Sequence, residues 1–201
     1  MSWKARLSLG ILLFSVSACS PSGNSGSDGP ARTTSSSELD GRWQSNCVDA
    51  VLFGNSQRKE LVVEGSAMTR VIRVSTAGNC GDSAAEIRET TQISIGREVS
   101  DGLNEFDITV TAMSIKPMSQ MGASILNSGV GFCGFKDWKV GMTKDITSAA
   151  GSGVCYPSLP AAFFDLYTVE GESLYFGEGE AAKEAAIRPT SIDRSERYTK
   201  Q

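Results

Sequence analysis

Residues 87–112 read IRETTQISIGREVSDGLNEFDITVTA, and this stretch decides the fold class. Apolar and polar residues alternate on both sides of Asp101-Gly102, a dipeptide that favours a tight hairpin turn. The residues that share one face at period two are Ile87, Glu89, Thr91, Ile93 and Ile95 before the turn, and Phe106, Ile108, Val110 and Ala112 after it. Such alternation is typical of strands with one buried face, so the stretch predicts an antiparallel β-hairpin.

Short strands continue this pattern on both sides of the hairpin. Residues 60–64 and 69–75 are rich in Val and Ile, and residues 164–169 and 173–177 flank a second turn at Glu170-Gly171-Glu172. Many short strands with closely spaced turn signals indicate an all-β protein built as an antiparallel barrel, half-barrel or sandwich.

One segment departs from the strand pattern. Residues 178–187 are rich in Ala, Glu and Lys and are followed by Arg188-Pro189, which ends a helix. They predict one short helix near the C-terminus, outside the barrel. The polar residues 194–201 predict a loose tail.

The N-terminus resembles the signal peptide of a bacterial lipoprotein. Lys4 and Arg6 precede an apolar block, Leu7 to Ala18, which is too short for a membrane-spanning helix of roughly 20 residues. The last residues of the block and the next one read Val16-Ser17-Ala18-Cys19. This sequence resembles a lipobox, whose cysteine is lipidated after the preceding residues are removed. Residues 1–18 are therefore predicted to be the signal peptide and Cys19 the lipidated residue. The alternative is a buried N-terminal helix. Ser20 implies release to the outer membrane by the sorting rule of Gram-negative lipoproteins.

The chain then divides into a linker and one domain. Residues 19–37 contain the lipidated cysteine and a linker rich in Ser and Gly, and the 18 residues after Cys19 give a flexible tether with a reach of roughly 20–25 Å. Residues 38–193 are long enough for one domain with a single core.

Composition excludes several functions. The formal net charge of −4 becomes −6 once Lys4 and Arg6 are removed, which argues against nucleic acid and against electrostatic binding to anionic lipid. The chain has no histidine, which excludes Ser-His-Asp and Cys-His catalysis and histidine-bound zinc. We therefore expect no enzyme, no cofactor and no metal. An enzyme would depend on carboxylates such as Asp137, Asp145 and Asp165.

The four cysteines besides Cys19 are Cys47, Cys80, Cys133 and Cys155. An even number of cysteines in an exported chain predicts two disulfides. Three pairings are possible, and we favour the sequential one, Cys47–Cys80 with Cys133–Cys155. A thiolate metal cluster is the alternative, although the spacing contains no Cys-x-x-Cys pair.

Apolar residues between Asp107 and Lys136 are interrupted by a single charge, Lys116. They predict either the lining of an apolar ligand cavity or an ordinary core with a covered loop. The candidate ligand-contact residues are Trp43, Met113, Ile115, Met118, Met121 and Trp138.

The order of several residues resembles one known family. The domain opens with Leu39, Gly41, Trp43, Ser45 and Cys47, and the Gly-x-Trp among them resembles the start of a lipocalin. The residues that follow are Cys133-Gly134, Trp138, Gly141, Asp145-Ile146-Thr147, Cys155, Asp165-Leu166, Leu174-Tyr175-Phe176-Gly177 and Arg188-Pro189. This succession resembles the lipocalin-like domain of the adenomatosis-polyposis-coli down-regulated family and covers most of residues 39–189. The chain departs from the family at Val48, around Cys80, and in having one copy of the domain.

The resemblance implies a barrel-like sheet with disulfides and a preference for a lipid-like guest. The main hypothesis is therefore a membrane-anchored envelope lipoprotein whose barrel binds a hydrophobic ligand. A non-catalytic structural or assembly protein with a filled barrel is the alternative, and an enzyme is a third.

Overall fold

The computed structural model describes residues 38–50, 53–100, 102–150, 155, 157–179 and 181–201. The predicted signal peptide, Cys19 and the linker lie outside the described residues. The strands are β1 (Gly41–Ser45), β2 (Val48–Asp49), β3 (Ser56–Glu64), β4 (Ala67–Ser75), β5 (Ser83–Ser100), β6 (Leu103–Pro117), β7 (Lys144–Asp145), β8 (Ala161–Glu170), β9 (Ser173–Phe176) and β10 (Tyr198–Lys200), and the α-helix is α1 (Gln120–Asn127).

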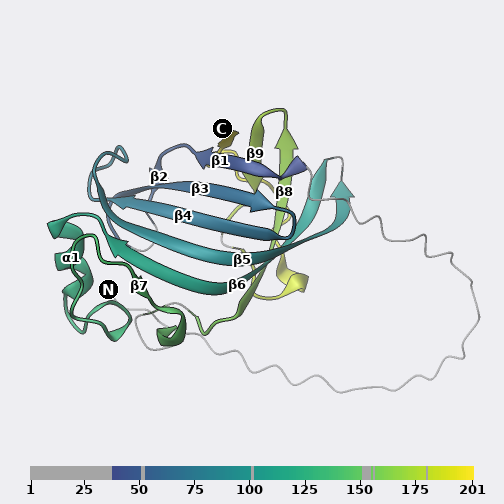
Figure 1. Cartoon of the computed structure of the whole chain (residues 1–201). Coiled ribbons are helices and arrows are strands. Elements are labelled where there is room, and N and C mark those ends of the chain that lie inside the picture. Colours follow the sequence, from purple (N-terminus) through teal and green to yellow (C-terminus); the bar gives the residue numbers. More distant parts are fainter. Residues whose placement is uncertain (1–37, 51–52, 101, 151–154, 156, 180) are drawn as a thin grey trace, which may run out of the picture. The chain divides into compact units, whose positions relative to one another are not determined.

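Eight of these strands close into a barrel. Their order is β1-β10-β9-β8-β6-β5-β4-β3, and β3 returns to pair with β1. Each pair is antiparallel, and the short strands β2 and β7 pair with the start of β3 and the end of β6. Figure 1 shows the long strands β3 to β6 curving side by side. The predicted all-β class and the antiparallel barrel are confirmed.

The hairpin predicted from residues 87–112 is formed by β5 and β6, which span 18 and 15 residues. Ser100 pairs with Leu103 across the turn, Gly102 takes a φ of +69°, and Asp101 lies outside the described residues. Ala112 is an exception to the predicted face. Thr90 pairs with Ala112 and Thr91 with Val110, so one residue of β6 bulges out, and Ala112 turns outward.

Both predicted disulfides are present in the sequential pairing. Cys47 and Cys80 have Cα atoms 5.8 Å apart, and those of Cys133 and Cys155 are 4.5 Å apart. Cys47–Cys80 joins the β1–β2 loop to the β4–β5 loop. Cys133–Cys155 joins the segment after α1 to the segment before β8.

The position predicted for the helix is wrong. The α-helix lies at α1, whereas residues 178–187 contain only a 3₁₀ turn at Ala185–Ile187, with Glu180 outside the described residues. Ala182 exchanges two backbone hydrogen bonds with Phe164 of β8, 2.7 and 2.9 Å long, and an extended backbone there precludes a helix. Sheet pairing has overridden helix propensity.

The C-terminal residues are ordered into the barrel, which corrects the predicted loose tail. In β10, Tyr198 pairs with Ser45 on one side and Leu174 on the other, so this strand completes the ring. The side chain of Asn46 accepts from the N–H of Arg197 (2.8 Å) and donates to the carbonyl of Ser195 (2.8 Å). A three-residue strand carries too little apolar periodicity to be recognised from sequence.

Candidate functional site

The six predicted ligand-contact residues fall into three places. Trp43 is fully buried in one apolar cluster, and Met113, Ile115 and Trp138 are buried in another. Met118 and Met121 are 40% and 60% exposed, outside the barrel. The structure therefore does not bring the six residues together around one cavity.

The buried apolar side chains form two clusters, one on the inner face of the barrel and one shared by β4, β5, β6, α1 and residues 133–146. Trp43 donates from its indole N–H to the carbonyl of Leu39 (2.8 Å) and lies among side chains of β3, β6 and β8. The first cluster comprises Leu39, Trp43, Leu61, Val63, Met68, Ile93, Phe106, Ile108, Val110, Tyr167, Leu174 and Tyr198. The second comprises Ile72, Val74, Ala85, Ile87, Met113, Ile115, Leu126, Cys133, Trp138 and Ile146.

Charged residues separate the two clusters. Along β4, Met68 belongs to the first cluster and Ile72 to the second, and Arg70 lies between them on the same face. Arg70 is directly opposite Glu89 of β5 and forms an ion pair with it. The side chain of Glu89 is only 2% exposed. Each charge of a buried ion pair is costly to desolvate, so each needs the opposite charge beside it.

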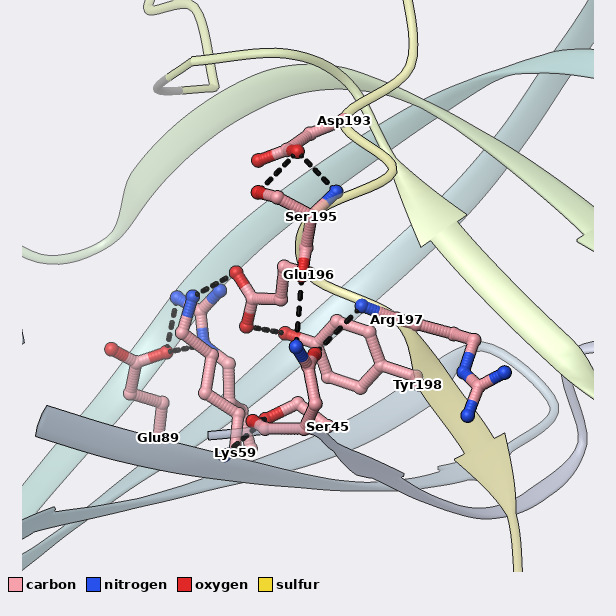
Figure 2. A network of polar contacts seen from close by, with 10 residues as sticks. Ser45, Lys59, Glu89, Asp193, Ser195, Glu196, Arg197 and Tyr198 are labelled. Atoms are coloured by element: carbon pink, nitrogen blue, oxygen red, sulfur yellow. Dashed lines mark hydrogen bonds and ion pairs between the residues drawn. The ribbon is translucent and has the colours of Figure 1, made fainter. Parts of the chain in front are cut away.

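The charged contacts continue toward the C-terminus, as Figure 2 shows. The ammonium of Lys59 in β3 is 2.8 Å from Glu196, and Glu196 also accepts from the hydroxyl of Tyr198 (2.8 Å). Burial raises the pKa of Tyr198 well above its ordinary value, so this hydroxyl stays a donor. We call Lys59, Arg70, Glu89, Glu196 and the Tyr198 hydroxyl the polar layer.

A small pocket opens beside the polar layer. Its volume is about 40 Å³, and it is lined by Arg70, Glu89, Val110, Met113, Pro157, Leu159, Ala161 and Phe163. Pockets for organic ligands measure roughly 300–1,000 Å³. This pocket has room for one or two water molecules rather than for an acyl chain.

Asp165 of β8 is a further buried acid. Its Oδ1 accepts hydrogen bonds from the backbone N–H groups of Leu166 (2.8 Å) and Gly177 (3.1 Å). Burial nevertheless raises the pKa of Asp165 to about 6, although those bonds and the charges of Arg70 and Arg188 oppose the rise. Protonation of Asp165 therefore favours the folded state.

Stability should fall as the pH rises from about 4 to about 6, because the folded protein then holds the Asp165 proton more tightly than the unfolded chain does. Asp165→Asn should remove this dependence. Urea unfolding at a series of pH values should show the variant gaining up to about 3 kcal/mol on the wild type across this range. Glu172→Gln, in an exposed turn, is the matched control. Parallel curves for Asp165→Asn and wild type would contradict the prediction.

An exposed apolar surface lies at α1. It consists of Met118, Met121, Val140 and Met142, which are 40% to 60% exposed. The N–H of Gly141 donates to the carbonyl of Pro117 (2.8 Å), which brings residues 140–142 beside Met118. Met121 follows Met118 by three residues across the start of α1. We call these four residues the Met surface.

The other acids considered for catalysis have separate structural roles. Asp137 is bound by the ammonium of Lys144 (2.6 Å), and Asp145 accepts from the N–H of Thr147 (2.8 Å). Within the described ranges, no group of three Cys, Asp or Glu side chains is placed to hold a metal ion. In the same ranges, no helix combines the length and apolarity needed to cross a membrane.

The sequence indicated only one member of the polar layer. Glu89 stands within the apolar alternation of β5, and a charge on a core-facing position is a signal for a buried ion pair. Arg70 alternates with apolar residues of β4, and Lys59 stands in the polar start of β3. Neither carries a signal of its own, because the partners Glu89 and Glu196 are distant in the sequence. Glu196 belongs to the segment predicted to be loose.

The chain matches no protein-family model and no curated protein.

Proposed function

We propose that this protein is a membrane-anchored lipoprotein of the cell envelope whose barrel is a filled, non-catalytic scaffold for structure or assembly. Three features support the proposal. The lipobox-like sequence ending at Cys19 is one, and the two disulfides, which are typical of exported proteins, are another. The third is the packed barrel interior.

The packed interior is the observation that carries the scaffold proposal. Trp43, Tyr167, Phe106 and Ile115 are at most 1% exposed, and the pocket beside the polar layer measures about 40 Å³. Admitting an acyl chain would require several of these side chains to move, at a cost comparable to making a core cavity. Contacts with partners are then made by the outer surface of the barrel.

Crosslinking in intact cells tests the scaffold proposal. The full chain should give discrete crosslinked partners in the envelope, and these should persist when the domain is exported without its lipid but kept at similar abundance. Absence of any crosslinked partner, together with lipid bound to the purified domain, would overturn it.

A lipid-like guest is the second candidate function, favoured by the composition of the pocket. Met113 and Phe163 supply apolar walls, as do Val110 and Leu159. The resemblance to the lipocalin-like family supports the same reading. This candidate requires the pocket to enlarge.

Lipidation is tested by metabolic labelling. The wild-type chain should incorporate labelled palmitate and should shift in mass on processing at Cys19, because the acyl chains are attached to that residue. Cys19→Ala should remove the label completely. A matched control, Ser17→Gly, keeps small residues before the cysteine and should be labelled normally. Label retained in Cys19→Ala would contradict the anchor.

A further inference from the structure

Exposed apolar side chains are concentrated in one part of the described chain. Five of its seven large exposed apolar residues lie between residues 118 and 142, and only Val99 and Ile187 lie elsewhere. The five are Met118, Met121, Val130, Val140 and Met142. Four of them form the Met surface, which the barrel core does not use.

The Met surface is held rigidly against the barrel. The N–H of Met118 donates to the carbonyl of Ala84 (2.8 Å), and Ser119 caps α1 by accepting from the N–H of Gly122 (3.1 Å). Gly122 lies so close to β5 that an added Cβ would be 1.8 Å from the carbonyl oxygen of Ala84. Ala123 and Leu126 are buried, whereas Met121 is exposed on the opposite side of α1. Figure 1 shows α1 at one end of the barrel.

The charge around the Met surface is opposite to that of the chain. Residues 116–144 contain four lysines and one acid, Asp137, a net charge of +3, whereas the whole chain carries −4. Two further acids lie nearby: Glu86 is opposite Lys116 in register, and Asp145 follows Lys144 in β7. Counting both leaves +1. Lys136 and Lys139 are exposed and have no ion-pair partner among the described residues.

We propose that the Met surface, with Lys136 and Lys139, docks the domain on an anionic phospholipid bilayer. Exposed Met and Val side chains beside lysines combine apolar insertion with attraction to anionic head groups. Each lysine near such a surface strengthens binding by about fivefold. The proposed anchor contributes to docking in one way. A tether at Cys19 would keep the Met surface near the membrane and raise its effective concentration there. The surface itself needs no lipid on Cys19.

Methionine footprinting on vesicles tests this docking. Residues 20–201 contain the whole closed barrel and both disulfides, and they lack histidine, so an N-terminal hexahistidine tag can tether them to nickel-chelating lipid in place of the acyl anchor. On vesicles containing phosphatidylglycerol, peroxide oxidation of Met118, Met121 and Met142 should slow several-fold relative to phosphatidylcholine vesicles. Buried Met68 and Met113 are internal controls and should react slowly on both.

Charge reversal gives the matched variants. Lys136→Glu with Lys139→Glu should reduce protection on phosphatidylglycerol to the level seen on phosphatidylcholine. Lys183→Glu with Arg197→Glu makes the same change at exposed residues elsewhere and should leave protection intact. Equal oxidation on both vesicles, or equal protection on both, overturns the proposal. Protection that rises with protein concentration without vesicles also overturns it and assigns the surface to a second copy. Because the tag replaces the acyl chains, these outcomes are independent of whether Cys19 is lipidated.

Discussion

A chain that ends at Arg197 is expected to lose most of its folding free energy. Removing residues 198–201 leaves the edges of β1 and β9 unpaired and takes Tyr198, 3% exposed, out of the core. Loss of a buried aromatic side chain alone costs about 3–5 kcal/mol, against a total of about 5–15 kcal/mol for a typical domain. Urea unfolding followed by circular dichroism should show a much lower midpoint or no cooperative transition.

Two substitutions at Tyr198 separate the contribution of its ring to stability from that of its hydroxyl. Tyr198→Ala keeps the strand but removes the ring, and it should cost about 3–5 kcal/mol. Tyr198→Phe keeps the ring and removes only the hydroxyl bond to Glu196, with an expected cost of about 1 kcal/mol. A truncated chain as stable as wild type would mean that β10 is not needed to close the barrel.

Arg70→Met is the second change with a large expected effect. It leaves the carboxylate of Glu89, which is 2% exposed, facing an apolar side chain in the barrel. Removing one partner of a buried ion pair costs about 3–5 kcal/mol, because the remaining charge is left without compensation. The free energy of unfolding at neutral pH should fall by that amount.

The double variant Arg70→Met with Glu89→Leu provides the matched test. Replacing both charges by apolar groups of similar volume is often neutral or stabilising, so most of the lost stability should return. Arg97→Glu with Glu105→Arg reverses an exposed ion pair; it is the surface control and should change stability by at most about 1 kcal/mol. Additive losses in the double variant Arg70→Met with Glu89→Leu would contradict a coupled pair inside the barrel.

The sequence predicted the elements whose signals are local. The alternation of residues 87–95 and 106–110 set the longest hairpin and its buried face, and the even number of cysteines after Cys19 predicted both disulfides. Neighbouring residues specified the hairpin, and the number of cysteines specified the two disulfides. The barrel class followed from the number of short strands and their turns.

The remaining features depend on contacts between distant segments. Ala182 pairs with Phe164, which suppresses the helix that its own neighbours favour. Tyr198 becomes a barrel strand because β1 and β9 lie on either side of it. The ion pair of Arg70 with Glu89 arises from strand register, which composition does not specify. The six candidate ligand-contact residues were predicted from residue type alone. Their positions depend on contacts between distant segments, and the fold does not bring them together.

Native mass spectrometry of residues 20–201 tests the central claim, a filled barrel, most directly. The protein, purified without detergent from cells rich in lipid, should show the mass of the disulfide-bonded polypeptide alone, before and after incubation with a fatty acid. Stoichiometric lipid that co-purifies, or uptake of one fatty acid per chain, would contradict the filled barrel and establish the lipid-like guest instead.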